Sequence, residues 1–290
     1  MVYVMMSRCC ALDQLHIVDK FDPEKITVDE DVKAEVARMD KVSVNTNPSP
    51  WMDPATLGLK VCSLNTLSLR KHMEDVRTDP VLLKSDVLCL METWLEEGEE
   101  EDERYQLEGF RGLFNSVGRG KGQAVYVKKE LEIRGIVNFA EPNIQMMKIE
   151  MESLDVIAVY RSKEEPLFTA KHQLQNLIHP EKDTMVIGDI NYGANEDNDF
   201  SRYLAREGFT QLVKLPTHIR GGINICFIAV NYSKNYSNES FEITPILSGI
   251  IDQAHLRTSA TRLKAQVETY SHYYSDHDSV TVVLENRAES

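Results

Sequence analysis

The stretch YYSDHDSVTVVL, residues 273–284, places Asp276 and His277 directly before an apolar, β-branched run. A run rich in Val and Thr after a polar turn is typical of a buried β-strand. A carboxylate beside an imidazole at the mouth of such a strand is one way to hold a metal ion and a phosphate group. A polar turn that caps the strand would have the same sequence. The assignment therefore depends on residues elsewhere in the chain.

The composition is that of a soluble globular protein. With 290 residues, 42% of them hydrophobic, the chain is long enough for one large domain plus an additional piece. Its five cysteines show no metal-like spacing, and Cys62 and Cys89 lie within apolar runs, which favours reduced thiols in an intracellular compartment. We find no signal peptide and no apolar run of membrane-spanning length, so no membrane association is expected.

The net charge of -14 argues against a generally basic protein that coats nucleic acid. Much of this charge comes from the acidic run at residues 96–103, and such a run is usually a solvated loop. A nuclease can nevertheless be acidic overall, because a metal site needs carboxylates and a few local arginines can attract phosphates. The charge therefore leaves the substrate open.

Hydrophobic patterning predicts a second domain over residues 59–286, after a linker rich in Pro, Asn, Ser and Thr at 43–58. Its expected strands lie at residues 59–66, 85–94, 122–129, 146–151, 154–161 and 184–191. Its expected helices lie at residues 69–83, 171–178 and 201–208, the last closed by Gly208. Strands and helices in mixed order indicate two sheets covered by helices.

In several of these strands a polar residue stands where the apolar run stops. These residues are Asn65, Glu92, Tyr160, Asp189 with Asn191, and Asp276 with His277. Carboxylates at strand ends suit a hard cation such as Mg²⁺, which prefers oxygen ligands and keeps several waters for a phosphate substrate. Each residue alone is an ordinary polar strand terminus, so the signal lies in the ordered set.

The ordered set resembles the endonuclease/exonuclease/phosphatase superfamily, which includes DNase I and the apurinic/apyrimidinic endonucleases. The resemblance extends from about Leu59 to Leu284 and depends on SLNT (63–66), LMETW (90–94), AVYR (158–161), GDIN (188–191), PTHIRGG (216–222) and YSDHD (274–278). It implies an α/β fold, the DNase I-like four-layer α-β-β-α sandwich of two packed mixed β-sheets flanked by helices.

The resemblance also implies roles for individual residues in a Mg²⁺-dependent hydrolysis, with Mn²⁺ as the other candidate ion. Glu92 would bind the metal, supported by Asn65 and Asp276. Asp189 would orient or deprotonate the attacking water, Asn191 and Tyr160 would hold phosphate oxygens, and His277 would stabilise the developing charge. Candidate substrate contacts are Arg161, Thr217 and Arg220.

The family pattern requires one further carboxylate, which hydrogen-bonds the active-site histidine from a strand shortly after residues 216–222. Asn224 is one candidate for this position. An amide there would keep the shape of the side chain but lose the charge that stabilises an imidazolium. If Asn224 holds the position, the site is damaged.

Asp252 is the other candidate, and it fits better. Joining Gly222 directly to Ile250 gives PTHIRGGIIDQAHLR, which resembles the loop and strand of the family without a gap. Asp252 lies 24 residues before Asp276 (276 − 252), close to the separation in the family, whereas Asn224 lies 52 residues before it (276 − 224). We therefore expect Asp252 to contact His277.

Residues 223–249 are then an insertion beside the active site. They are rich in Asn, Ser, Tyr and Ile, and they could be an intron that is translated in frame. A natural surface loop is the alternative, since loops of this length are tolerated when their ends lie close together. In either case the insertion could displace the strand that carries Asp252.

The N-terminus resembles another family. The stretches YVMMSR (3–8) and LDQL (12–15) resemble the last conserved motif of the superfamily 1 helicases that Helitron transposons carry, in which the arginine matching Arg8 reaches the γ-phosphate of ATP. The chain has no Gly-Lys-Thr phosphate loop, which excludes helicase activity for this fragment. We expect residues 1–42 to be a helicase remnant, a strand pair plus a helix.

The sequence thus predicts a DNA endonuclease of transposon origin, resembling Helitron-like proteins and working in the nucleus. Two alternatives stay open. The fold also serves lipid and inositol phosphatases, so a phosphoesterase of another substrate class is the first. A decayed product that only binds nucleic acid or a partner protein is the second, and the truncated helicase and the interruption at 223–249 favour it.

Overall fold

The structure is a computed structural model that describes residues 49–193, 199–213, 217–220, 247–249, 252–258 and 263–286. A compact unit begins at Ser49. The expected helicase remnant at 1–42 and most of the proposed insertion at 223–249 lie outside the described residues.

Residues 49–58 belong to the folded unit, although the sequence predicts a linker there. The Trp51 side chain has no solvent exposure. Its indole N–H donates to the carbonyl oxygen of Val81 at 3.0 Å, and the Lys60 ammonium donates to the Trp51 carbonyl at 2.9 Å. Burial of an aromatic side chain contributes about 2–3 kcal/mol, which explains why this polar stretch is ordered. The domain therefore begins before Leu59.

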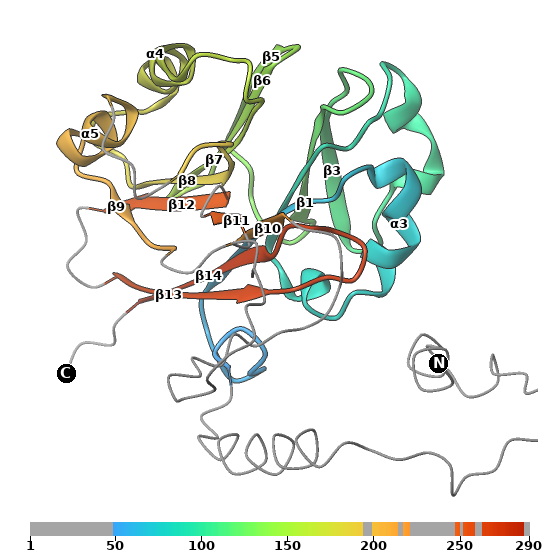
Figure 1. Ribbon diagram of the computed structural model, residues 1–290. Coiled ribbons are helices and arrows are strands. Elements are labelled where there is room, and N and C mark those ends of the chain that lie inside the picture. Colours follow the sequence, from blue (N-terminus) through green and yellow to red (C-terminus); the bar gives the residue numbers. More distant parts are fainter. Residues whose placement is uncertain are drawn as a thin grey trace, which may run out of the picture. The chain divides into compact units, whose positions relative to one another are not determined.

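The first sheet has six strands in the order β13-β14-β1-β2-β4-β3 (Figure 1). Their bounds are β1 Leu59–Asn65, β2 Val87–Met91, β3 Phe110–Asn115, β4 Gln123–Lys128, β13 Leu263–Tyr270 and β14 Ser279–Asn286. β1 runs parallel to β2 and antiparallel to β14. The sheet is therefore mixed.

The second sheet also has six strands, in the order β5-β6-β7-β8-β12-β9. Their bounds are β5 Gly135–Glu141, β6 Ile144–Glu150, β7 Asp155–Arg161, β8 Thr184–Asp189, β9 Thr210–Gln211 and β12 Asp252–Arg257. β7 and β8 are parallel, and β12 runs antiparallel to β8. This sheet is mixed as well.

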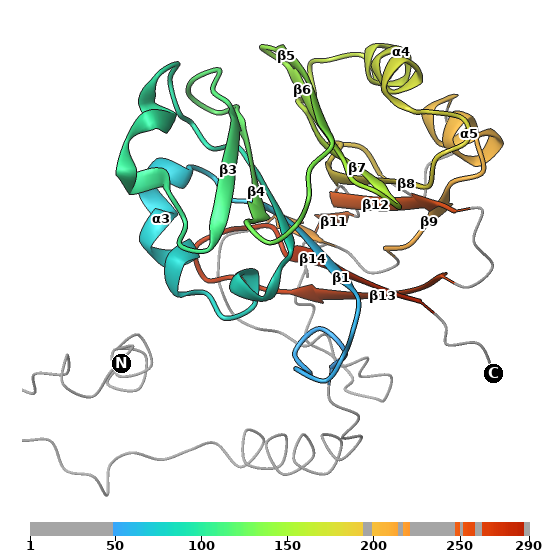
Figure 2. The same cartoon turned by 180° about the vertical axis from the view of Figure 1, so that it is seen from behind.

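Helices cover the outer faces of the two sheets, as the two opposite views show (Figures 1 and 2). The α-helices are α3 Leu69–Thr78, α4 Leu167–Leu177 and α5 Asp199–Arg206, and the 3-10 helices are η3 Leu82–Lys84, η4 Glu99–Glu101 and η5 Glu103–Tyr105. α3 lies on the first sheet, and α4 and α5 lie on the second. In the described part of the chain, no helix is long and apolar enough to cross a membrane.

Three apolar clusters fill the space between these layers. The central cluster joins the inner faces of the two sheets, and Val61 of β1 and Ile187 of β8 belong to it. The neighbouring residue Cys62 points to the other face, where it packs with Met73 of α3. The third cluster joins the second sheet to α4 and α5. Period-two alternation thus gives the central strands β1, β2, β7 and β8 two buried faces, and the predicted four-layer sandwich is confirmed.

The helix predicted over residues 69–83 is shorter in the structure. α3 begins after Ser68, whose side chain accepts the Lys71 N–H, and ends at Thr78. Asp79 precedes Pro80, and a residue before proline disfavours helical geometry. The Asp79 carboxylate also accepts the Val81 N–H at 2.9 Å, which begins a separate turn. The sequence pattern did not register this break.

Candidate active site

Strand direction brings the candidate residues to one edge of the two sheets. Because β1 is parallel to β2 and β7 to β8, their carboxyl ends share an edge. β14 and β12 are antiparallel to β1 and β8, so they begin at the same edge. Residues that end the parallel strands therefore meet residues that begin the antiparallel ones.

Asn65, the last residue of β1, connects the two sheets. Its Nδ2 donates to Oε1 of Glu92 at 2.9 Å and to Oδ2 of Asp189 at 3.0 Å. Its Oδ1 accepts the Leu67 N–H at 3.1 Å. A carboxylate only accepts hydrogen bonds, so the amide nitrogen has to face both acids. Asn65 thus orients Glu92 and Asp189.

The Tyr160 hydroxyl lies between Glu92 and a glycine-rich loop. It is 3.3 Å from Oε1 of Glu92 and 3.2 Å from the carbonyl oxygen of Gly120. Burial raises the pKa of the Tyr160 phenol, and the Glu92 charge raises it further. The hydroxyl therefore keeps its proton and acts as a hydrogen-bond donor.

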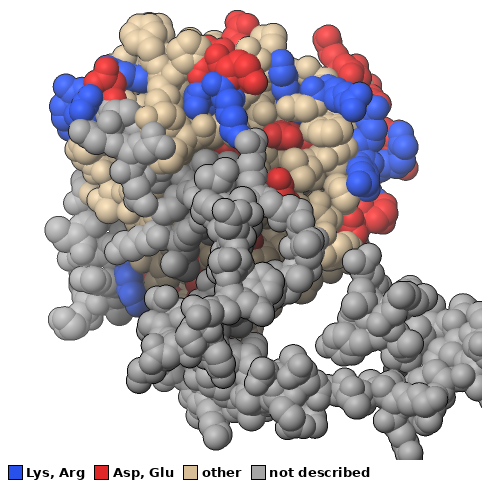
Figure 3. Space-filling view, viewed as in Figure 1, with Lys and Arg blue, Asp and Glu red and all other residues tan. Residues whose placement is uncertain are grey.

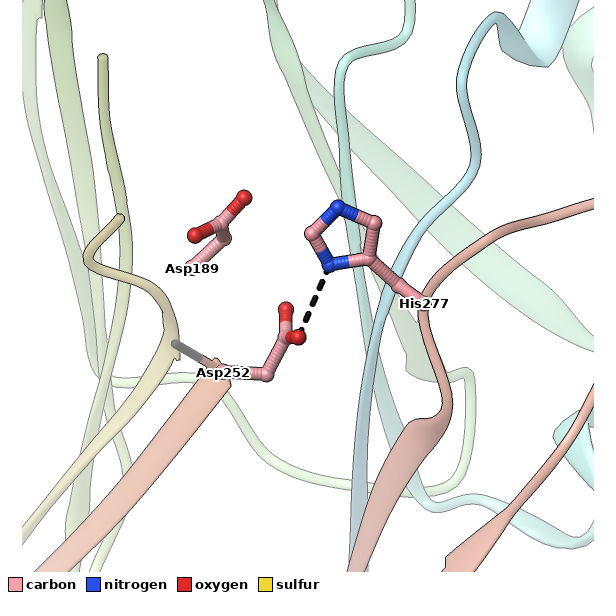
Figure 4. A group of neighbouring side chains, drawn as sticks. All are labelled: Asp189, Asp252 and His277. Atoms are coloured by element: carbon pink, nitrogen blue, oxygen red, sulfur yellow. Dashed lines mark hydrogen bonds and ion pairs between the residues drawn. The ribbon is translucent and has the colours of Figure 1, made fainter. Parts of the chain in front are cut away.

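Asp252 and His277 form a buried pair (Figure 4). Nδ1 of His277 lies 2.8 Å from Oδ2 of Asp252, and the two residues are 6% and 1% exposed. Asp252 begins β12, where it pairs in register with Asp189 of β8. The expected contact between Asp252 and His277 is present, and Asn224 lies outside the described residues.

The charges of this group affect one another. Burial lowers the pKa of His277, but the carboxylates of Asp252, Asp189 and Asp276, with Asp252 the largest of the three, outweigh burial and raise it to about 9. Burial also raises the pKa of Asp189, and the Asp252 carboxylate adds to that increase. His277 is therefore an imidazolium at neutral pH, with its Nδ1–H directed at Asp252.

A cavity of about 310 Å³ opens beside this network. The predicted site residues in its wall are Glu92, Tyr160, Asn191, Asp276 and His277. Asn65, Asp189 and Asp252 are buried behind them. The structure thus divides the predicted residues into a group that a substrate can contact and a group that supports it.

Backbone strain is concentrated at this edge. The described non-glycine residues with positive φ are Leu67, Ser68, Glu92, Trp94 and Asn191. Left-handed geometry costs such residues about 1–2 kcal/mol each, and it persists where the surroundings impose it. At Asn191 the surroundings are the Asp189 carboxylate, which accepts both its backbone N–H at 2.8 Å and its Nδ2 at 3.1 Å.

Two of the predicted substrate contacts are buried instead. Arg161 is 3% exposed, and its guanidinium donates to the carbonyl oxygens of Ser162, Glu165, Ile190 and Asn191. Thr217 has no exposure; its Oγ1 accepts the Asp252 N–H at 3.1 Å. Neither side chain lines the cavity, so both organise its walls. Arg220 lies in the short strand β10 His218–Arg220, and its side chain is outside the described part.

Lys121 and Lys163 also line the cavity, although the sequence analysis did not single them out. The Lys121 ammonium donates to Oδ1 of Asn143 at 2.9 Å. The sequence feature that could have predicted Lys121 is the glycine-rich stretch GRGKG at residues 118–122. Gly120 and Gly122 have positive φ there and turn the chain at the cavity. Lys163 follows a strand end in an unpatterned loop and has no comparable signal.

Two groups of side chains have the donor atoms that a cation needs. One is the carboxylate pair Glu92 and Asp276 in the cavity wall. The other is Asp189, Asp252 and His277, whose ligand atoms lie within 4.8 Å of one another. Oδ1 of Asp252 is buried and has no hydrogen-bond partner among the described residues. The second group is more enclosed than the first. The hydrogen bond between Asp252 and His277 already uses Nδ1 of His277, so that nitrogen is not available to a cation.

This fold and this arrangement of acids and histidine define a DNase I-like protein. The chain belongs to the Endonuclease/Exonuclease/phosphatase family, whose model matches residues 62–277. Members of this family and the similar solved structures are hydrolytic enzymes.

Three solved structures illustrate the likeness. A 3′ phosphatase from Neisseria bound to a product DNA hairpin has a TM-score of 0.57 at 15% identity, over 78% of this chain and 99% of that one. An AP endonuclease from Archaeoglobus fulgidus has a TM-score of 0.53 at 17% identity, over 78% of this chain and 99% of that one. The endonuclease domain of TRAS1, a telomere-specific non-LTR retrotransposon, has a TM-score of 0.50 at 14% identity, over 79% of this chain and 100% of that one. A comparison with curated sequences found no significant match.

Proposed function

We propose that this chain is a metal-dependent endonuclease that hydrolyses phosphodiester bonds in DNA. One observation carries the proposal. A single cavity brings together two carboxylates, Glu92 and Asp276, and the imidazolium of His277, which is bonded to the buried Asp252. Carboxylates for a cation beside fixed positive charge and hydrogen-bond donors are what phosphoryl chemistry requires.

Glu92 and Asp276 are the residues that would hold Mg²⁺ or Mn²⁺. Their donors are carboxylate oxygens, which hard cations prefer, and both side chains face the cavity that a phosphate could enter. Asn65 and Tyr160 fix Oε1 of Glu92 by hydrogen bonds at 2.9 and 3.3 Å. When bound, the ion would neutralise charge on the phosphate oxygens and on the leaving group.

The other residues would bind and orient the reactants for an in-line attack of water on phosphorus. His277, Asn191 and Tyr160 line the cavity, and the imidazolium of His277 suits a phosphate oxygen. The N–H groups of Asn191 donate to Asp189 and to the Arg161 carbonyl, and the Tyr160 hydroxyl donates to Glu92 or Gly120. Asn191 and Tyr160 would exchange these bonds to hold phosphate oxygens. The Asp189 carboxylate accepts three hydrogen bonds, from Nδ2 of Asn65 and from the backbone and side chain of Asn191. Asp189 has no solvent exposure in this structure, so it holds Asn65 and Asn191 in place; its role in orienting the attacking water is proposed for the substrate-bound state.

DNA is the proposed substrate because of two further features. Lys121 and Lys163 stand in the cavity wall, where they would contact backbone phosphates on either side of the scissile bond. Elsewhere, on the face in Figure 3, basic and acidic side chains are interspersed and form no extended basic surface. Binding would therefore depend on local contacts. The Neisseria 3′ phosphatase, which was solved with a product DNA hairpin, supports the same substrate class.

Nicking of supercoiled plasmid in Mg²⁺ tests the proposal. We expect wild-type protein to nick the plasmid, and Glu92→Ala and His277→Ala to lose the activity while they remain folded. Glu181→Ala, an exposed acid that precedes β8 at the end of the strand opposite to Asp189, is the control and should retain it. A panel of lipid and inositol phosphates tested in parallel would identify another substrate class if those were hydrolysed faster.

We further infer an origin in a transposon and a nuclear location. The support is the helicase-like stretch at residues 3–15 and the fold shared with a retrotransposon endonuclease. A non-enzyme that only binds nucleic acid is the competing outcome. Folded protein that binds DNA without cleaving it would establish that outcome, and imaging of the tagged chain in cells tests the location.

A further inference from the structure

A second hydrogen-bonded network holds the segment at residues 271–278, which connects β13 to β14 and carries Asp276 and His277. In both opposite views this segment reaches from the two strands across to α3 (Figures 1 and 2). The network consists of Asp79, His272, Tyr274 and Ser279. None of these four residues lines the active-site cavity.

Asp79 is the centre of the network. Its Oδ2 lies 2.7 Å from Nδ1 of His272 and accepts the Tyr274 hydroxyl at 3.1 Å. Its Oδ1 accepts the backbone N–H groups of Val81 and Leu82 at 2.9 and 3.2 Å. A carboxylate with four such partners is fixed in place. Because Asp79 directly follows α3, it ties the end of that helix to the segment.

His272 closes the segment on itself. Its Nε2 lies 2.8 Å from Oγ of Ser279, the first residue of β14, so one imidazole joins the start of the segment to its end. A serine, a histidine and an aspartate linked by hydrogen bonds are also the components of a catalytic triad. Ser279, however, has no solvent exposure, so no substrate can reach its hydroxyl. The array therefore serves geometry rather than a second reaction.

Three further hydrogen bonds fix the half of the segment nearer the cavity. Oγ of Ser275 donates to the Asn65 carbonyl at 2.6 Å and accepts the His277 N–H at 3.0 Å. The Asp278 N–H donates to the Thr217 carbonyl at 2.7 Å. With His272 and Asp79 holding the other half, the segment is anchored on both sides of Asp276.

We propose that His272 and Asp79 are positioning residues, which hold the 271–278 segment so that Asp276 and His277 face the cavity. The proposal depends on the proposed function, because it assigns these two cavity residues to the reaction. A misplacement of about 1 Å at reacting groups can cost roughly a hundredfold in rate, so the network has a measurable effect.

The test replaces His272 with leucine, which has a similar volume but no hydrogen bonds. We expect His272→Leu to cleave plasmid roughly 10- to 100-fold more slowly than wild type and to need a higher Mg²⁺ concentration for half-maximal rate. His272→Gln keeps polar atoms at both positions and should recover part of the loss. Leu174→Ala, which truncates a buried side chain of α4, should lower the stability of the protein without changing the Mg²⁺ requirement.

Amide hydrogen exchange provides a readout without metal or substrate. Residues 271–278 should exchange at least tenfold faster in His272→Leu than in wild type, and at the wild-type rate in Leu174→Ala. Unchanged exchange and unchanged Mg²⁺ dependence in a folded His272→Leu protein would overturn the proposal. If the wild-type protein cleaved no DNA, only the proposed function would fail, because the exchange result tests the positioning separately.

Discussion

At the residue scale, the site depends on Asp252 reaching His277. Asp252 begins β12 of the second sheet, whereas His277 lies just before β14 of the first sheet, and their 2.8 Å hydrogen bond is almost entirely buried. At low dielectric such a bond stabilises a charged imidazole strongly. The charge of His277, which lines the cavity, is therefore favoured by Asp252, a buried residue that does not line it.

Asp252→Asn tests this dependence. The amide keeps the size of the side chain but removes the negative charge, so His277 should lose its proton at neutral pH. We expect the nicking rate to fall by roughly a hundredfold or more with little loss of stability. The measurement is single-turnover cleavage beside thermal unfolding. A rate within a factor of two of wild type would show that the charge is not used.

His255 makes stability depend on pH. Burial lowers its pKa to about 4, so between about 4 and the ordinary value near 6.5 the unfolded chain binds a proton that the folded chain does not. Its contribution to stability is full above pH 6.5 and is lost as pH falls toward 4. We expect about 2 kcal/mol of loss between pH 7 and pH 5.

Urea unfolding of wild type and His255→Gln at the two pH values measures this contribution. The variant has no imidazole, so its free energy of unfolding should fall by about 2 kcal/mol less than that of wild type over the same interval. Equal pH dependence in the two proteins would mean that His255 titrates normally in the folded state.

At the element scale, the strand β8 delivers Asp189 only because Gly188 precedes it. Gly188 has φ +143, and a Cβ there would overlap the carbonyl oxygen of Val159 on the parallel strand β7. Neither backbone can move without breaking the ladder that aligns the site. A single side chain at this position therefore disturbs both strands.

Gly188→Ala should accordingly lower the free energy of unfolding by about 3 kcal/mol or more, or prevent folding. Gly98→Ala is the matched control: its φ is +90, but no atom lies within 4 Å of the added Cβ. There we expect only the backbone cost, about 1–2 kcal/mol. Chemical denaturation compares the two, and similar losses would show that strand contact is unimportant at Gly188.

Elements with strong local patterns could be predicted from the sequence, and others could not. The apolar runs of β1, β2, β7 and β8 end at polar residues, so both strands and site residues were visible. β5 was missed because it is an edge strand with mostly exposed residues. Its pattern does not differ from that of a polar loop.

Contacts between segments far apart in the sequence could not be predicted either. The guanidinium of Arg161 turns inward because the carbonyl oxygens of Ile190 and Asn191 come near it in the fold. Trp51 is buried for a similar reason, since its partner Val81 lies 30 residues further along the chain. No local spacing carries this information, so both residues were assigned to the wrong environment.

At the scale of the whole molecule, residues 221–246 interrupt the sequence but not the pairing around them. β10 pairs antiparallel with β11 Leu247–Gly249, and Arg220 lies opposite Leu247. Asp252, only three residues beyond β11, then takes its place in the second sheet. The ends of the interruption are thus joined, and the strand that carries Asp252 stays in register.

The expected insertion at 223–249 extends three residues too far, because 247–249 form β11 and pair with β10. Deletion of residues 223–246 should therefore be tolerated. Joining Gly222 to Leu247 leaves Gly221 and Gly222 as a two-residue turn between β10 and β11, a length and composition that suit a tight hairpin. We expect the shortened protein to fold and to nick DNA within a few-fold of the full chain. Loss of the fold would show that the segment is an integral part. Transcripts that lack these codons would support an intron origin.

We propose that one cavity, with Glu92 and Asp276 for the metal and His277 for the phosphate, cleaves DNA. The most direct test is the rate at which the full chain nicks supercoiled plasmid in Mg²⁺, compared with Glu92→Ala at equal concentration. We expect the full chain to cleave the plasmid, and cleavage to stop in Glu92→Ala and when the metal is chelated. Equal cleavage by both proteins, or none by folded wild-type protein, would contradict it.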